Sequence, residues 1–273
     1  MASVAEVDLQ PFFFGPSNSL YGAYHPAEMN TTAPETAVVI CQSIGHEYMR
    51  AYRACWQLAE TAARRNAHVL RFDYAATGDS QGRQTERSWT AWVDSVGHAI
   101  DWLADHTGLV DVRLLGLRVG ALMGAQAAVH SRSVNRAVLW DPVFDGAQFM
   151  HELTDMHVTY TRAMNRYRPL RHRHAEHDTD EYLGFHLPRP VTDALAEARL
   201  SRMLPRGAVD WHLACSSGLE TADDDLLTHL AHRGGRCVAL PEPMDWHDVD
   251  AQYRRLTLPR STNTLLDLLL ESS

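Results

Sequence analysis

A short stretch near the middle of the chain combines glycines and a charged residue in a spacing associated with catalysis. Gly116 and Gly120 flank Arg118, between an apolar stretch at 112–115 and an alanine-rich stretch at 121–130. The related pattern Gly-x-Ser-x-Gly forms a sharp strand-to-helix turn that holds a nucleophile in a strained conformation, and its glycines allow close packing. A guanidinium cannot attack an acyl carbon and keeps its proton near neutral pH, so this turn lacks the usual nucleophile.

Arg118 has two interpretations. Its planar guanidinium is suited to bind the carboxylate or phosphate of a ligand. The alternative is a structural ion pair, most simply with Glu47, that holds two loops together. Both roles are compatible, because Glu47 can orient the guanidinium while its outer edge stays available for a substrate carboxylate. A buried arginine without any anionic partner is too costly to persist.

A second polar turn follows the apolar stretch 37–41. It comprises Ser43, Ile44, Gly45 and His46. If this turn lies beside Arg118, its backbone N–H groups and that of Val119 form a substrate-binding anion pocket at the start of a helix. The alternative is a plain strand-to-helix turn.

His247 follows the last apolar stretch, 236–240, where the histidine of a Ser–acid–His triad is found in chain order. It is a candidate general acid or base, and the alternative is a surface histidine whose ring is satisfied by Asp245 or Asp248. The candidate partner acids follow predicted strands and are Asp141, Glu220 and Asp223. Asp141 has the alternative role of capping a turn before a proline.

Other side chains are candidate nucleophiles or metal ligands. The candidate nucleophiles are Cys41, Ser43, Ser80 and Ser216. Cys41 ends a buried stretch, where thiols are usually inert, and Ser43 is the hydroxyl best placed to meet His247. The candidate metal ligands are His172, His174, His177 and His186. Their spacing fits no zinc signature, so a solvated surface is favoured, and we expect neither a metal ion nor a cofactor.

Hydrophobic periodicity predicts the elements that position these residues. The predicted strands are 12–14, 20–24, 37–41, 68–73, 112–115, 135–140, 210–215 and 236–240. The predicted helices are 48–65, 89–103, 121–130, 223–233 and 260–271, the last with Ser261 or Thr262 as its N-cap. The first two strands form an antiparallel hairpin. The remaining alternation predicts an α/β fold with a mostly parallel eight-stranded sheet, helices on both faces, and a ligand site beyond the carboxyl ends of the strands.

The composition changes within the chain. Residues 145–206 are rich in histidine and charged side chains and have no clear strand pattern. We interpret this segment as a helical cap inserted into a core formed by residues 1–144 and 207–273.

Bulk properties limit the location and partners of the protein. Of its 273 residues 45% are hydrophobic, and the formal net charge of −9 disfavours a nucleic-acid partner. The four cysteines form no C-x-x-C pair, which is typical of a reducing compartment. There is no apolar run near the ~18 residues of a membrane span, and the first ten residues do not resemble a signal peptide. We therefore expect a cytoplasmic, soluble protein without a membrane partner.

Several motifs together resemble a known group of proteins. The motifs are Phe12–Pro16, His46–Arg50, Leu70–Tyr74, Thr77–Ser80, Gly116–Ala121 and Leu139–Val143. The chain resembles serine-aminopeptidase-like α/β-hydrolases, and more narrowly the exosortase A system-associated hydrolases, whose elbow also reads Gly-Leu-Arg-Leu-Gly-Ala. The resemblance implies the α/β-hydrolase fold and, because relatives occur beside exopolysaccharide genes and in biosynthetic clusters, a role in biosynthesis.

Two hypotheses of function follow. The first is an enzyme acting on a small, anionic intermediate that is carboxylated or carries an acyl, ester or thioester group. Arg118 anchors the anion, and Glu47 or His247 activates water or moves a proton in a non-covalent hydrolysis, a lyase step or a cyclisation. The second is an inactive pseudo-hydrolase that binds or scaffolds another pathway protein, and a homodimer is also compatible with the sequence. An enzyme predicts a partly closed pocket at Arg118, whereas a scaffold predicts a large exposed apolar patch.

Overall fold

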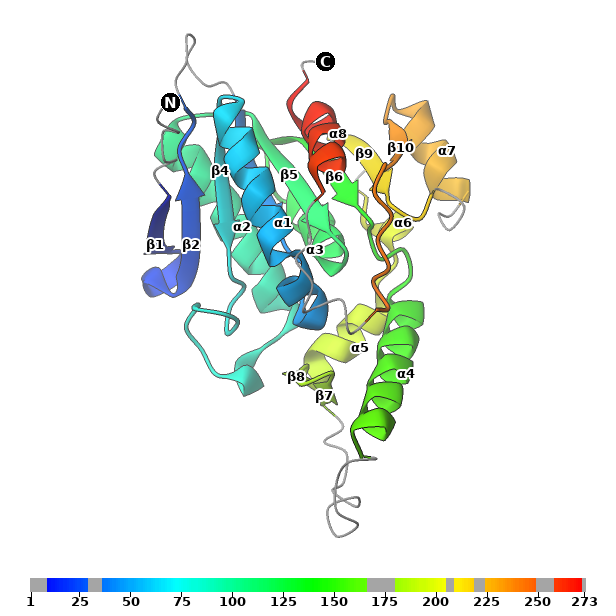
Figure 1. Ribbon diagram of the computed structural model, residues 1–273. Helices are drawn as coiled ribbons and strands as arrows, with labels where there is room; N and C mark the ends of the chain where they lie inside the picture. Colours follow the sequence, from blue (N-terminus) through cyan, green and yellow to red (C-terminus); the bar gives the residue numbers. More distant parts are fainter. Residues whose placement is uncertain are drawn as a thin grey trace, which may run out of the picture.

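A computed structural model of the protein describes residues 9–28, 36–165, 180–204, 209–218, 224–248 and 258–271. The strands of its main sheet are β1 (Gln10–Phe14), β2 (Leu20–His25), β3 (Thr36–Cys41), β4 (Ala67–Phe72), β5 (Val112–Leu117), β6 (Val134–Trp140), β9 (Asp210–Cys215) and β10 (Cys237–Ala239). They lie in the order β1-β2-β4-β3-β5-β6-β9-β10 (Figure 1). The pairs β1–β2 and β2–β4 are antiparallel and the others are parallel, which confirms the predicted mostly parallel eight-stranded sheet.

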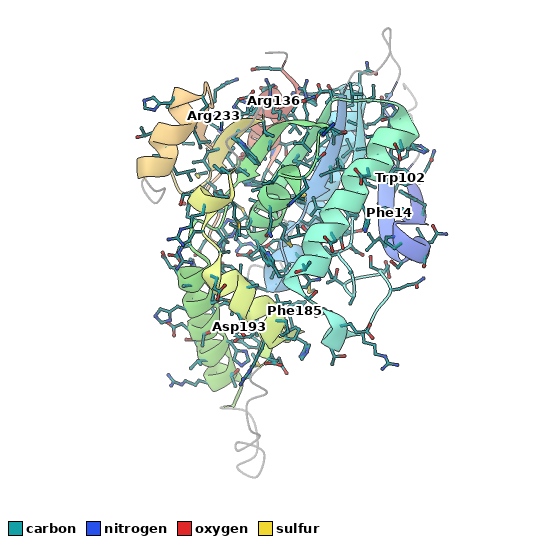
Figure 2. The ribbon with its side chains drawn as sticks, turned by 180° about the vertical axis from the view of Figure 1, so that it is seen from behind. Phe14, Trp102, Arg136, Phe185, Asp193 and Arg233 are labelled. Carbon is teal, nitrogen blue, oxygen red and sulfur yellow. The ribbon has the colours of Figure 1, made fainter. Side chains whose placement is uncertain are left out.

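Helices cover both faces of this sheet. They are α1 (Gly45–Arg64), α2 (Trp89–Thr107), α3 (Val119–Ala128), α7 (Asp224–His232) and α8 (Pro259–Leu270), with short 3-10 turns η1 (Pro16–Asn18) and η2 (Gln84–Glu86). Successive strand residues face opposite sides, so Val39 packs with α2 and α3 whereas Val38 packs with α1 and α8. At the hairpin end, Phe14 of β1 lies beside Trp102 of α2, with ring centroids 6.0 Å apart (Figure 2).

Several helix starts differ from the sequence prediction, and those of α1 and α8 change the role of a named residue. Helix α1 begins at Gly45 rather than Tyr48, which places Glu47 in its first turn. Helix α8 begins earlier than predicted, with Leu258 as N-cap and Pro259 as first residue, so neither Ser261 nor Thr262 is the cap. A carboxylate distant in sequence replaces the local cap, since Glu242 accepts hydrogen bonds from the backbone N–H groups of Arg260 and Ser261.

The described part of the segment between β6 and β9 is mainly helical. It contains α4 (Gly146–Asn165), α5 (Arg189–Glu197) and α6 (Leu200–Met203), together with a small antiparallel hairpin of β7 (Glu181–Tyr182) and β8 (Phe185–His186) that the sequence pattern did not indicate. Helices α4 and α5 and the hairpin lie together beyond one end of the sheet (Figure 1). Within the described ranges, no helix is both long and apolar enough to cross a membrane.

Candidate functional site

The turn between β5 and α3 is built as its glycines predict. Arg118 has φ 54° and ψ −120°, a strained conformation for a residue with a side chain. A Cβ at Gly116 would collide with Ala121, and one at Gly120 would collide with the carbonyl oxygen of Cys41. The glycines therefore let α3 pack against β5 and β3, and the elbow directs the side chain of residue 118 away from the sheet.

Arg118 forms the expected ion pair with Glu47. Its Nε lies 2.8 Å from Glu47 Oε1, and the other carboxylate oxygen accepts a hydrogen bond of 2.6 Å from Ser43 Oγ. The side chain of Glu47 is 1% exposed and that of Arg118 is 13% exposed. Both oxygens of Glu47 are thus engaged, and its role in this arrangement is to orient the guanidinium.

The outer part of the guanidinium faces an open pocket. Arg118 Nη1 donates to the carbonyl oxygen of Asp141 at 3.1 Å, and the guanidinium carbon lies 5.4 Å from the Trp246 ring centroid and 5.8 Å from that of Phe149. Two of the five guanidinium N–H donors are used in the Nε and Nη1 contacts. The remaining donors have no hydrogen-bond partner among the described residues.

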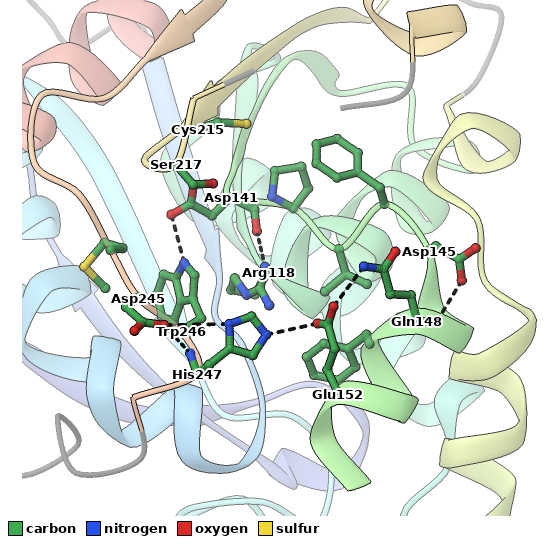
Figure 3. Close-up of a pocket in the computed structure, with 15 residues that line it drawn as sticks. Arg118, Asp141, Asp145, Gln148, Glu152, Cys215, Ser217, Asp245, Trp246 and His247 are labelled. Carbon is green, nitrogen blue, oxygen red and sulfur yellow. Dashed lines mark hydrogen bonds and ion pairs between the residues drawn. The ribbon is translucent and has the colours of Figure 1, made fainter. Parts of the chain in front are cut away.

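This pocket, which we call the Arg118 pocket, has a volume of about 340 Å³. Figure 3 shows Arg118 at its centre, Glu152 of α4 on one side, and Trp246 and His247 from the loop after β10 on the other. Phe149 and Trp246 supply apolar surface next to the charged groups. A cavity of this size and mixed lining suits a small organic molecule.

His247 lies at the rim of the Arg118 pocket, with its side chain 55% exposed. Its Nε2 is 3.2 Å from Glu152 Oε2, and its backbone N–H donates to Asp245 Oδ1 at 2.9 Å (Figure 3). The ring Nδ1 lies 3.7 Å from the same Asp245 oxygen. The expected local contact with Asp245 is therefore present, and the longer-range carboxylate beside the imidazole is Glu152.

Asp141 contributes its backbone and not its carboxylate to the Arg118 pocket. Its Oδ1 accepts the backbone N–H of Ser216 at 2.6 Å, and its Oδ2 accepts Ser216 Oγ at 2.6 Å and Trp246 Nε1 at 2.9 Å. This carboxylate joins three loops and makes no contact with His247. The other candidate acids, Glu220 and Asp223, lie outside the described residues.

The polar turn after β3 faces a different cavity, of about 350 Å³. Ser43, Ile44 and Gly45 line it together with Tyr48, Asp73 and Phe185. Burial raises the pKa of Asp73, whose carboxylate accepts Tyr48 Oη at 2.9 Å and the backbone N–H of Asp79 at 3.0 Å. The turn and Arg118 thus line two separate cavities, and the buried Glu47 contacts both Ser43 and Arg118.

Two of the expected anion-binding residues line neither cavity. Val119 is fully buried and His46 is 3% exposed, and neither contributes to the walls of the Arg118 pocket or of the cavity beside Ser43. Of the predicted site residues, the structure brings together Arg118, Glu47 and Ser43 in one hydrogen-bonded chain.

The candidate nucleophiles all have structural partners or are buried. Burial raises the pKa of Cys41 to about 12, so its thiol stays protonated near neutral pH. Ser80 Oγ donates to the Asp73 carbonyl, and Ser216 and Ser43 donate to carboxylates. Cys215 lines the Arg118 pocket, and burial raises its pKa to about 12 as well.

The candidate metal ligands lie mostly outside the described ranges. His172, His174 and His177 fall there, whereas His186 ends strand β8. No group of three or more His, Cys, Asp or Glu side chains in the described part of the chain is placed to hold a metal ion.

Sequence reasoning missed Glu152, Phe149 and Trp246. The apolar spacing of Phe149, Met150 and Leu153 in α4 carries the only available signal, because it places Glu152 next to a buried helix face. The sequence does not show which part of the core this face meets. Trp246 stands next to His247, but its bond to Asp141 joins residues 105 positions apart.

Solved structures with the same fold match nearly the whole chain. A hypothetical protein from Pseudomonas aeruginosa has a TM-score of 0.60 at 15% identity, covering 98% of this chain and 96% of that chain. An α/β serine hydrolase without a lid from Xanthomonas campestris has a TM-score of 0.57 at 12% identity, covering 100% of both chains. The bottromycin epimerase BotH in complex with bottromycin A2 has a TM-score of 0.53 at 17% identity, covering 94% of this chain and 96% of that chain.

No protein-family model matches the sequence, and no curated protein matches it either. The structural neighbours share the α/β-hydrolase fold, and their low sequence identity means that they establish the fold alone.

Proposed function

We propose that this protein, which has the α/β-hydrolase fold, is an enzyme without a serine nucleophile that binds a small carboxylated biosynthetic intermediate at Arg118. The observation that carries the proposal is the set of unused guanidinium donors facing a 340 Å³ pocket. A carboxylate accepts two parallel hydrogen bonds from such an edge. Because Glu47 fixes the guanidinium in advance, binding does not need to order this long side chain.

His247 with Glu152 is the proposed group for proton transfer. The imidazole lies in the wall of the Arg118 pocket, and Glu152 holds its Nε2. An imidazole hydrogen-bonded to a carboxylate can take up or give up a proton near neutral pH. Glu47 is better suited to position Arg118, since its carboxylate is buried and both oxygens are engaged.

The proposed reaction classes share a proton transfer close to a bound acid. They are hydrolysis by activated water without a covalent intermediate, a lyase step and a cyclisation. The fold is compatible with chemistry other than ester cleavage, as the name of the bottromycin epimerase illustrates. The resemblance to exosortase A system-associated hydrolases favours a biosynthetic role, and the free cysteines favour the cytoplasm.

Binding of matched ligands tests the anion anchor. We expect 3-phenylpropionate, measured by isothermal titration calorimetry, to bind at least about tenfold more tightly than its neutral amide, because only the acid matches the guanidinium edge. The double variant Arg118→Met/Glu47→Gln removes both charges together and is expected to abolish this preference. The matched control is Arg113→Met/Asp111→Asn, which removes another arginine–carboxylate pair that does not line the Arg118 pocket. Equal affinity for acid and amide would overturn the anchor.

Turnover tests the proton-transfer group. Carboxylic acids, esters and thioesters would be incubated with the protein in D2O, with products and deuterium incorporation followed by mass spectrometry. His247→Gln is expected to lower the turnover by about 10²-fold, the usual contribution of a general acid or base. Unchanged turnover in this variant would assign the proton transfer to another group.

A further inference from the structure

The charges around the Arg118 pocket indicate more about the ligand than the guanidinium alone. We propose that the ligand is an amino-carboxylate, with its carboxylate on Arg118 and an ammonium group at the acidic rim formed by Glu152 and Asp245. This inference rests on the proposed function and narrows its substrate class.

Carboxylates outnumber cations around the Arg118 pocket. Apart from Asp141, whose carboxylate bonds Ser216 and Trp246, the lining carboxylates are those of Asp145, Glu152 and Asp245. Outside the lining, Glu47 already offsets the charge of Arg118, and Arg199 offsets that of Asp145. Arg50 contacts the backbone oxygen of Asp245 and lies over the Trp246 ring at 5.6 Å.

The sum of these described charges is negative. Four carboxylates, Glu47 included, face the three guanidiniums of Arg118, Arg199 and Arg50, which leaves a formal balance of −1 when histidines are left out of the count. A ligand that brought only a carboxylate would add a further negative charge to a partly enclosed space. A ligand that also brings an ammonium group leaves the balance unchanged, so electrostatic complementarity favours it.

Unused hydrogen-bonding groups of both kinds, donors and an acceptor, line the pocket. Arg118 offers N–H donors at the base, as described above. At the rim, Asp245 uses Oδ1 to accept from His247, and its Oδ2 has no partner among the described residues. An ammonium group is all donor and has no acceptor, so it matches Asp245 Oδ2. The Glu152 carboxylate can also accept from it, in addition to its contacts with Gln148 and His247.

Part of the wall of the pocket is apolar. Trp246 is 6% exposed and Phe149 is 4% exposed, and both touch the pocket next to Arg118. Aromatic faces in this position suit a hydrocarbon or aromatic skeleton that carries the two charged groups. A phosphate ester or a dicarboxylate would instead place its second negative charge among the acidic side chains.

Three ligands with one skeleton separate the contributions. L-phenylalanine carries both charges, 3-phenylpropionate lacks the ammonium group, and 2-phenylethylamine lacks the carboxylate. By isothermal titration calorimetry we expect L-phenylalanine to bind about fivefold more tightly than either single-charge ligand, the size of one partly exposed ion pair. The series is repeated with leucine, 4-methylpentanoate and 3-methylbutylamine, so that the result does not depend on the phenyl ring.

The variant Glu152→Gln/Asp245→Asn tests the rim. It is expected to bring the affinities for L-phenylalanine and 3-phenylpropionate within about twofold of each other, since little of the ion-pair energy remains. The control Asp155→Asn removes an exposed carboxylate from the same helix that lines a neighbouring groove and not this pocket, and it should keep the preference.

The outcomes distinguish this inference from the proposed function. 3-Phenylpropionate could bind as tightly as L-phenylalanine and lose this binding in Arg118→Met/Glu47→Gln. In that case the proposal of an amino-carboxylate ligand is wrong, while the anion anchor stands. The anchor and this inference fail together in two cases. In the first, neither acid binds up to its solubility limit. In the second, Arg118→Met/Glu47→Gln binds each acid with the same affinity as the wild type.

Discussion

Arg118 and Glu47, 71 positions apart in the chain, form a hydrogen-bonded ion pair of 2.8 Å beneath the Arg118 pocket. The pair ties the turn between β5 and α3 to the first turn of α1. It also places a fixed cation where serine hydrolases of this fold hold a nucleophile. A guanidinium cannot serve as that nucleophile, and in the proposed function it is instead an oriented anion-binding group.

Removing one partner of this pair should destabilise the fold. Glu47→Gln leaves the Arg118 charge without its carboxylate, and Arg118→Met leaves the Glu47 carboxylate buried and unpaired. Each is expected to lower the free energy of unfolding by about 3 kcal/mol, the lower end for a broken buried pair. The double variant should recover part of this loss, and urea denaturation of all four proteins gives the coupling energy.

The control for this cycle is Glu60→Gln. Glu60 lies on the same helix and faces the exposed Arg64 at 3.7 Å, so its loss should change the free energy by less than about 1 kcal/mol. If the effects of Glu47→Gln and Arg118→Met simply add in the double variant, the two side chains do not stabilise each other.

Replacing Arg118 by Ser should not create an esterase. His247 is held by Glu152 and Asp245, and the Asp141 carboxylate is occupied by Ser216 and Trp246. A hydroxyl at position 118 therefore has no general base and partner acid placed to activate it. Small errors in the position of catalytic groups reduce the rate of hydrolysis by orders of magnitude. The Arg118→Ser/Glu47→Gln variant is expected to hydrolyse p-nitrophenyl acetate at the rate of the wild type. A clear gain over the wild type would reveal an intact base.

A serine-directed fluorophosphonate probe should leave the protein unlabelled. Ser43, the serine closest to the elbow in the hydrogen-bonded chain, is 1% exposed and donates to Glu47. That carboxylate is paired with Arg118, so the Ser43 hydroxyl is held within a buried ion pair. Intact-mass spectrometry after incubation measures labelling, with a known serine esterase as positive control. A stoichiometric adduct mapped to Ser43 would contradict this account.

Acid should weaken the fold through buried histidines. Burial lowers the pKa of His25 from 6.5 to about 3, helped by the nearby Arg71, and burial also lowers the pKa of His46. Between pH 6.5 and about 3, His25 is thus protonated to a greater extent in the unfolded chain than in the folded one. Its contribution to the free energy of unfolding therefore falls as the pH drops through this window, by up to about 1.4 kcal/mol per pH unit, and His46 acts in the same direction.

His25→Gln should make this pH dependence shallower. A glutamine amide does not titrate, and its oxygen can accept from Arg71 Nε, as His25 Nε2 does at 3.2 Å. Urea denaturation at several pH values measures the slope, with the exposed His130→Gln as control. Identical slopes in wild type and His25→Gln would show that His25 is not responsible.

Much of the fold could be predicted because its signals are local. Gly116 and Gly120 define the elbow, and apolar stretches such as 37–41 define buried strands within one residue of β3. The predicted cap of α8 was wrong because the actual group, Glu242, comes from a loop 19 positions away in sequence. Local propensity carries no information about such a contact.

The site could be predicted only in part. The Arg118–Glu47 pair could be predicted because a buried guanidinium needs an anionic partner and few carboxylates are near enough to supply it. The division into two cavities could not, because it depends on where Glu47 fills the space between the turn after β3 and the elbow. The contact of His247 with Glu152 depends on how α4 lies over the core, which periodicity does not specify.

The hydrogen bonds on Asp141 have a mechanical consequence. They fasten the ends of β6 and β9 and the loop of Trp246 into one body, so this wall of the Arg118 pocket is stiff. The opposite wall is α4, linked across the opening by the contact of Glu152 with His247 and that of Phe149 with Arg118. We therefore expect a longer form of the proposed ligand to displace α4 while its anchored end keeps its orientation, so that the site would accept ligands of different lengths.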